Sequence, residues 1–149
     1  MDTRVQSEEY AEIGARVIEE EDSLIDLRNS SATIVYLTSE QTKTDKGRKV
    51  GAECEKVPEK YKWSIPADYT ITVFLPNIEG FTEEQKRILI FHELLHINIT
   101  YDKSNAEVYG IKGHDYEDFK EITDRYGTEW NIPKSELRML SNELKVKGE

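Results

Sequence analysis

The segment from Arg87 to Ile99 constrains the fold more than any other part of the chain, because it is apolar nearly all the way around a helical wheel. A helix that is apolar on every side is buried inside a domain. The same segment contains the pentapeptide HELLH at residues 92–96, so two histidines and a carboxylate are predicted to be buried with it. Burying these groups costs on the order of several kcal/mol unless they are paired or hold a metal ion.

The HELLH pentapeptide matches the zinc-binding pattern H-E-x-x-H. Positions i and i+4 lie on the same face of a helix, so the imidazoles of His92 and His96 can reach one metal ion. Neutral imidazole is a preferred ligand of Zn²⁺, and three protein ligands leave a fourth position for water. Glu93 projects from the edge of the same face, where it can take a proton from that water. The sequence therefore predicts His92 and His96 as zinc ligands and Glu93 as the catalytic base.

The third ligand is less directly specified. The extended pattern H-E-x-x-H-x-x-G-x-x-H is absent, because Ile99 stands at the glycine position and Asp102 at the position of the last histidine. Asp102 can serve as a ligand only if the chain turns back sharply without that glycine. Glu107 and Glu117 lie at the distances used by sites that take a glutamate from a later helix.

His114 is the favoured third ligand, because all three histidines of the chain then serve one site. Gly113 before it lets the backbone approach closely. Metal-bound histidine usually donates its second N–H to a carboxylate, and Asp115 or Asp118 is expected to accept it.

Other expectations concern the reaction and its alternatives. A tetrahedral intermediate needs a hydrogen-bond donor near its oxyanion, and Tyr101, Tyr109 and Tyr116 are candidates that the sequence does not rank. The expected reaction is hydrolysis of a peptide bond. A binding module that keeps the metal for structure and a zinc hydrolase acting on other amides are the alternatives.

Composition excludes several classes of protein. The chain has 149 residues, which fits one domain spanning residues 1–149. Its formal net charge of −10 argues against nucleic acid as a partner. The polar N-terminus and the lack of an apolar run of about 20 residues indicate a soluble, cytoplasmic protein without a membrane partner. The one cysteine, Cys54, is expected to be a small, buried or half-buried strand residue. The oligomeric state is left open.

Hydrophobic periodicity and turn residues predict an α+β fold, with a short, mostly antiparallel sheet packed against the buried motif helix and further helices. A capping box is predicted at Thr82–Gln85, and its helix is expected to run to about Ile99. The acidic run 19–22 is expected to be a solvated helix end, and an edge of the sheet that contains strand 69–75 is expected to be able to bind an extended peptide. The remaining predicted elements are helix 8–20, strands 33–38 and 49–57, a hairpin loop or mobile surface segment at 43–48, a polar connection over 101–113, a helix from 115–118 to Gly127, and helix 133–145.

Two stretches, Thr82–Ile97 and Gly113–Phe119, resemble the metallopeptidases encoded by bacteriophages and prophages. The upstream stretches Gly51–Tyr61 and Ala67–Ile71 are similar to the same family, so the resemblance covers about residues 50–126. It implies a single small zincin-like metallopeptidase domain that uses Zn²⁺ and acts on a peptide or protein. It also implies metal positions at His92, His96 and His114, and the catalytic position at Glu93.

The chain is more distantly similar to the SprT-like proteases, which also have a late third histidine. It departs from them because it has neither a cysteine-based zinc ribbon nor a basic DNA-binding arm. A role at DNA–protein crosslinks is therefore not expected.

Overall fold

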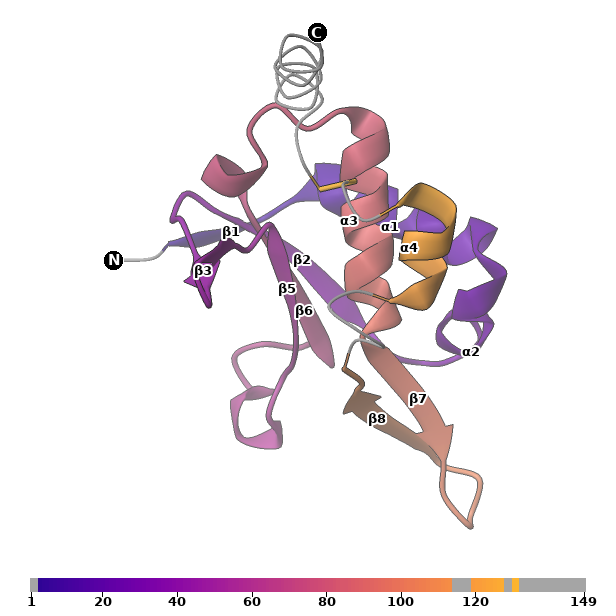
Figure 1. The fold of residues 1–149 in the computed structure, drawn as a ribbon. Coiled ribbons are helices and arrows are strands. Elements are labelled where there is room, and N and C mark those ends of the chain that lie inside the picture. Colours follow the sequence, from indigo (N-terminus) through magenta and orange to yellow (C-terminus); the bar gives the residue numbers. More distant parts are fainter. Residues whose placement is uncertain (1–2, 114–118, 128–129, 132–149) are drawn as a thin grey trace, which may run out of the picture.

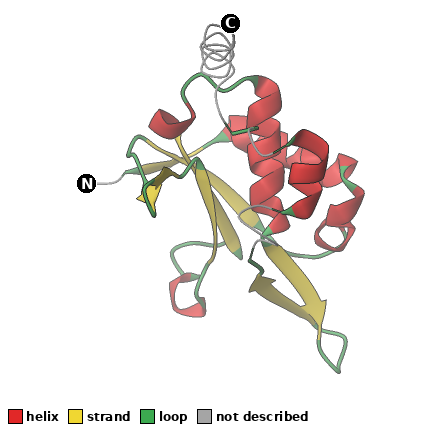
Figure 2. Ribbon diagram, in the orientation of Figure 1, coloured by secondary structure: helices red, strands yellow, loops and turns green. Residues whose placement is uncertain are grey.

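The computed structural model describes residues 3–113, 119–127, 130 and 131, and the structural statements below refer to these residues. The predicted helix 133–145 and the predicted helix start at 115–118 lie outside them. Figure 1 shows a twisted sheet with helices packed on one side and a separate hairpin projecting below, and Figure 2 shows the same layers by element type. The predicted α+β class is confirmed.

Four strands form the main sheet: β1 (Arg4–Gln6), β2 (Ile34–Ser39), β6 (Tyr69–Phe74) and β5 (Ala52–Lys56), in the order β1-β2-β6-β5. The β1–β2 and β5–β6 pairs are antiparallel and the β2–β6 pair is parallel, so the sheet is mostly antiparallel as predicted. The edges of this sheet are β1 and β5, and β6 lies between β2 and β5. Its near-continuous burial is typical of a central strand.

Helix α1 (Glu8–Glu20), whose predicted bounds are confirmed, packs against the sheet beside α3 (Glu83–Leu95). Its buried face includes Gly14, which lies directly over the ring of Tyr36 on β2. The core between these helices and the sheet is aliphatic and aromatic. Its fully buried members include Tyr10, Val17, Tyr69, Ile71, Ile90, Phe91 and Leu94.

The capping box at the start of α3 is confirmed: the Gln85 N–H donates to the Thr82 hydroxyl at 3.2 Å, and the Thr82 N–H donates to the Gln85 side chain at 3.0 Å. The prediction that this helix continues to about Ile99 is wrong, because α3 ends at Leu95 with His96 as its C-cap. Residues 97–101 are rich in β-branched side chains and form strand β7 (Ile97–Tyr101) instead.

Strand β7 pairs with β8 (Glu107–Ile111) in an antiparallel hairpin that projects from the end of α3. The predicted polar connection over 101–113 is therefore also wrong. Gly110 is not a turn residue but lies within the ladder opposite Asn98. Burial alternates along β7, where Ile97 and Ile99 are buried and Asn98 and Thr100 are exposed, a pattern that the helical interpretation obscured.

The smaller elements complete the described chain. Helix α4 (Lys120–Tyr126) packs beside α3 and ends at Gly127, whose φ of 79° confirms the predicted C-cap. The predicted hairpin at 43–48 is confirmed as β3 (Thr44–Asp45) and β4 (Arg48–Lys49). The others are α2 (Ile25–Arg28) and the 3₁₀ turns η1 (Asp22–Leu24), η2 (Glu59–Tyr61) and η3 (Leu75–Ile78). Within the described residues, no helix combines the length and the apolar character that crossing a membrane requires.

Glu21 corrects the prediction that the acidic run after α1 is solvated. Its side chain is buried and accepts hydrogen bonds from two guanidinium groups, Arg125 of α4 at 2.7 Å and Arg87 of α3 at 3.3 Å. Burial alone would raise the pKa of Glu21, but these hydrogen bonds outweigh it and lower that pKa below its usual range. The Glu21 carboxylate therefore joins α1, α3 and α4. In the sequence, nothing distinguishes Glu21 from the acidic residues beside it.

Candidate metal centre

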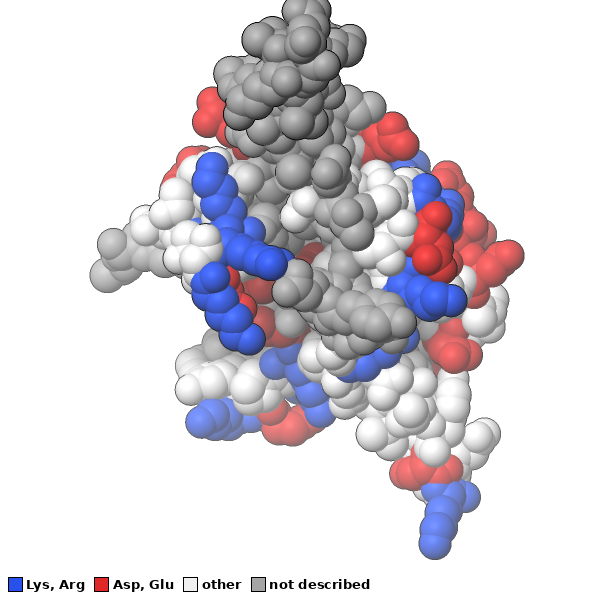
Figure 3. Space-filling model, in the orientation of Figure 1, with Lys and Arg blue, Asp and Glu red and all other residues white. Residues whose placement is uncertain are grey.

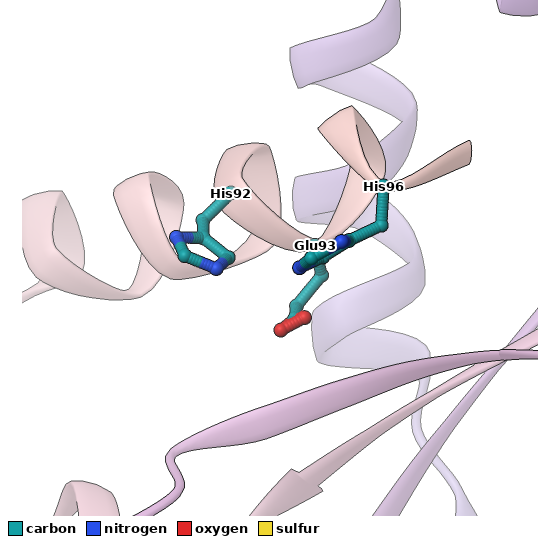
Figure 4. Close-up of side chains that lie close together, drawn as sticks. All are labelled: His92, Glu93 and His96. Carbon is teal, nitrogen blue, oxygen red and sulfur yellow. The ribbon is translucent and has the colours of Figure 1, made fainter. Parts of the chain in front are cut away.

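The last turn of α3 brings two imidazoles and a carboxylate together. His92 and Glu93 lie in the helix and His96 caps its end, so the histidines are separated by one helical turn. Their ring centroids are 5.3 Å apart, and one ligand atom from each of His92, Glu93 and His96 lies within 4.8 Å of the other two. Figure 4 shows the three side chains on the same side of the helix. The predicted metal pair and its neighbouring carboxylate therefore share one site.

A backbone carbonyl orients the His96 ring. Its Nδ1 lies 2.8 Å from the carbonyl oxygen of Lys112, and the Lys112 N–H donates to the His96 carbonyl at 2.8 Å. A carbonyl oxygen can only accept, so Nδ1 carries a proton, and in the neutral ring Nε2 then holds the lone pair. This is the orientation that a metal-ligating histidine needs, since its second nitrogen is usually held by a hydrogen bond.

Aromatic side chains pack around both imidazoles. The ring of Phe119, at the start of α4, has its centroid 4.9 Å from that of His96 and 5.5 Å from that of His92. The Trp130 ring lies 5.7 Å from His92, and its carbonyl accepts a hydrogen bond from the buried side chain of Gln85 at 2.9 Å. These contacts limit the rotation of the rings and exclude water from one side of the site.

Glu93 is only 4% exposed and lies on the side of α3 that faces the sheet. The pKa of Cys54 on β5 is raised, first by burial and then by the negative charge of Glu93, which places this carboxylate near β5. The expected half-buried position of Cys54 in a strand is confirmed. Gly51, just before β5, packs against Leu89 of α3, so β5 runs alongside the motif helix.

The structure separates two of the alternative third ligands from the site. The Asp102 carboxylate accepts hydrogen bonds from the N–H groups of Ser104 and Ala106, which makes it part of the turn between β7 and β8. The Glu107 carboxylate accepts from the backbone N–H of Ser31 at 3.0 Å. Within the described chain, the metal cluster contains neither Asp102 nor Glu107.

The favoured ligand His114 and the alternative Glu117 lie outside the described residues, as do Asp115 and Asp118, the expected partners of His114. The described residues on both sides of this segment contact the site: Lys112 through its carbonyl and Phe119 through its ring.

Two of the three tyrosines considered as oxyanion donors lie along the hairpin. Tyr101 is the fifth residue after His96 in the extended strand β7, which corresponds to about 16 Å at about 3.3 Å per residue. The Tyr109 hydroxyl donates to Glu107 at 2.5 Å, and this bond raises its pKa to about 12. Tyr101 is therefore distant from His96 along the strand, and the Tyr109 hydroxyl is engaged by Glu107. Tyr116 lies outside the described residues.

Sequence reasoning did not identify Lys112, Phe119 or Trp130 as parts of the site. Lys112 acts through its carbonyl, which every residue possesses, so no side-chain pattern marks it. Phe119 and Trp130 are aromatic residues that are indistinguishable in sequence from ordinary core positions. Phe119 does lie within the stretch Gly113–Phe119 that carried the family resemblance.

Fold and site together define a small α+β domain with a histidine–carboxylate–histidine cluster on a buried helix, an arrangement compatible with a zincin-like domain. The chain belongs to a phage metallopeptidase family, because the family model described as "Putative phage metallopeptidase" matches residues 3–140. No curated protein and no solved structure gives a significant match. The family confirms the resemblance expected from the sequence and implies a metal ion and a protein or peptide substrate.

Proposed function

We propose that the chain is a zinc-dependent peptidase, a single zincin-like domain in which His92 and His96 hold Zn²⁺ and Glu93 is the general base. The observation that carries this proposal is the convergence of the three ligand atoms within 4.8 Å at the end of one helix. The protonated Nδ1 of His96 fits the proposal, because it leaves Nε2 available to the metal. A site with only a structural role has no need for a buried carboxylate beside the two imidazoles.

We propose His114 as the third ligand. Lys112, two residues before His114 in the sequence, contacts His96 through its carbonyl. Asp102 and Glu107 are engaged in the hairpin and its contact with Ser31. Between His114 and Glu117, imidazole matches the metal position that the family resemblance implies.

Each residue of the site has a distinct task in this reaction. Bound Zn²⁺ supplies Lewis acidity, which lowers the pKa of a coordinated water toward about 7 and polarises the substrate carbonyl. Glu93 takes a proton from the attacking water and delivers it to the leaving amine as the bond between carbonyl carbon and amide nitrogen breaks. The Lys112 carbonyl keeps the His96 ring in the ligating tautomer.

An extended substrate is proposed to lie along β5. This strand is an edge of the sheet, it runs beside α3, and the charge of Glu93 acts on its central residue Cys54. A peptide added to such an edge gains main-chain hydrogen bonds, and its scissile bond then lies beside Glu93. Among the edges of this sheet, β5 is the one proposed to bind the peptide, because it lies beside α3.

Replacing Glu93 by Gln tests the proposed base. The amide cannot accept the proton from water, so turnover of a peptide library is expected to fall by about 10²- to 10⁴-fold while one zinc per chain is retained. Metal content and peptide cleavage are measured on the same sample. Glu12→Gln, an exposed change on α1, is the matched control and keeps the parent activity. Parental cleavage by the Glu93→Gln protein would refute the assignment.

Replacing His114 by Ala tests the third ligand. Loss of one of three ligands is expected to let a mild chelator remove the zinc that the parent retains, and metal content after dialysis measures this. The matched change Glu117→Gln is expected to leave zinc retention unchanged. The reverse result, with zinc lost only in Glu117→Gln, would assign the third position to the glutamate.

A further inference from the structure

We propose that the β3–β4 hairpin selects acidic residues in the substrate, on the side of the scissile bond that lies over the start of β5. This inference rests on the proposed peptidase function. Four of the seven residues from 43 to 49 are Lys or Arg and one is acidic, in a chain whose net charge is −10. We call this segment the basic hairpin; its cations are Lys43, Lys46, Arg48 and Lys49.

The basic hairpin lies at one end of the strand that is proposed to bind substrate. It leads directly into Gly51, which packs on Leu89, one helical turn before His92. Three residues further along, Cys54 is near enough to Glu93 for the carboxylate to raise its thiol pKa. The hairpin therefore borders substrate residues displaced from the scissile bond toward the start of β5.

The base of the basic hairpin is fixed. The side-chain amide of Asn77 donates to the carbonyl oxygens of Lys43 at 2.7 Å and Val50 at 2.8 Å, and the Val50 N–H donates to the Lys43 carbonyl at 3.0 Å. Its turn is formed by Lys46 and Gly47, with φ angles of 53° and 78°. Because these hydrogen bonds fix the base of the hairpin, its charged side chains start from a defined position.

Lys46 and Lys49 are the cations left to bind a ligand. Lys43 forms an ion pair with Glu53, whereas Lys46 and Lys49 are exposed and form no ion pair within the described chain. In Figure 3, Lys and Arg side chains gather on the left of this face, where Figure 1 places the hairpin. Because the protein as a whole repels anions, a local positive rim favours an acidic peptide in one register and disfavours the others.

Charge reversal tests this inference. Parent, Lys46→Glu/Lys49→Glu and the control Lys60→Glu/Lys103→Glu are given a mixed peptide library, and the residues flanking each cut are identified by mass spectrometry. The parent is expected to favour Asp and Glu on one side of the cut. Reversal in the hairpin is expected to reduce that preference about tenfold. The control, which makes the same change in net charge at two exposed lysines elsewhere, keeps it. A preference that is absent, or unchanged by reversal, overturns the inference.

Binding separates this inference from the peptidase proposal. Fluorescent peptide pairs that differ only as Glu against Gln are titrated into zinc-loaded Glu93→Gln protein, with and without the hairpin reversal. The Glu peptide is expected to bind more tightly to the unreversed protein, with an advantage that shrinks as the Debye length falls from about 10 Å at 0.1 M salt to about 3 Å at 1 M. Equal affinities overturn hairpin selection even if the parent cleaves peptides. If the parent cleaves no peptide and the affinity difference is still present, the peptidase proposal alone is refuted.

Discussion

His96 combines three roles at one position. It ends α3 as the C-cap, it begins the connection to β7, and it presents an imidazole to the candidate metal centre. Its Nδ1 donates to the Lys112 carbonyl, and its backbone carbonyl accepts from the Lys112 N–H. The ring orientation is therefore fixed by the residue that follows β8, so a ligand from α3 depends on a residue sixteen positions later in the chain.

Phe119→Leu tests whether aromatic packing holds the two imidazoles. The substitution keeps an apolar side chain in a buried position, so the free energy of unfolding is expected to change by less than about 1.5 kcal/mol. Loss of the flat ring against His92 and His96 is expected to weaken zinc binding by about tenfold. Competition with a chromogenic chelator measures the affinity, and urea unfolding measures the stability. An unchanged zinc affinity would show that the ring has no role in ligand orientation.

At the scale of elements, α1 packs closely against the sheet beside α3. Gly14 allows this close packing: a Cβ built there would lie 2.1 Å from the Tyr36 hydroxyl oxygen and 2.3 Å from Cζ. Tyr36 is buried in β2 and shares a row with Ile71 and Cys54 across the sheet. Close packing against Tyr36 therefore explains why glycine stands in the middle of this helix despite its poor helix propensity.

Gly14→Ala is therefore expected to destabilise the protein by about 1–3 kcal/mol, because Tyr36 cannot move without disturbing the strands beside it. Helix propensity alone predicts the opposite, a gain of up to about 1 kcal/mol. Glu12→Ala, an exposed change in the same helix, is the control for propensity. Thermal and urea unfolding decide between the two, and a stabilised Gly14→Ala protein would contradict the packing at Tyr36.

At the scale of the whole molecule, one buried carboxylate joins the helices around the candidate metal centre. Glu21 follows α1 and accepts hydrogen bonds from Arg87 of α3 and Arg125 of α4. The Arg125 guanidinium also lies 5.7 Å from the Phe91 ring, next to His92 in the sequence. Helix α4, which places Phe119 against the imidazoles, is held to the motif helix by this ion-pair network.

Glu21→Gln tests the network through its pH dependence. Because the pKa of Glu21 is lowered in the folded protein, its stabilising effect is present above the unfolded value of about 4.3 and is lost as the pH falls through the folded value. The variant is expected to be about 1–3 kcal/mol less stable than the parent at pH 7, with the difference shrinking below about pH 4. Urea unfolding at both pH values measures it, with Glu12→Gln as control. A difference that is independent of pH would exclude the carboxylate charge as its cause.

The sequence by itself determined the elements whose signals are local: the bounds of α1, the capping box of α3, the small hairpin before β5 and the H-E-x-x-H spacing that puts two imidazoles one turn apart. Tertiary structure decided what depends on pairing. Ile97 and Ile99 suit either a helix or a strand, and the partner strand β8 made them a strand. Strand order made β5 an edge of the sheet and β6 a central strand. The Lys112 carbonyl and the burial of Glu21 were likewise set by residues distant in sequence, because a hydrogen bond between remote groups leaves no periodic pattern along the chain.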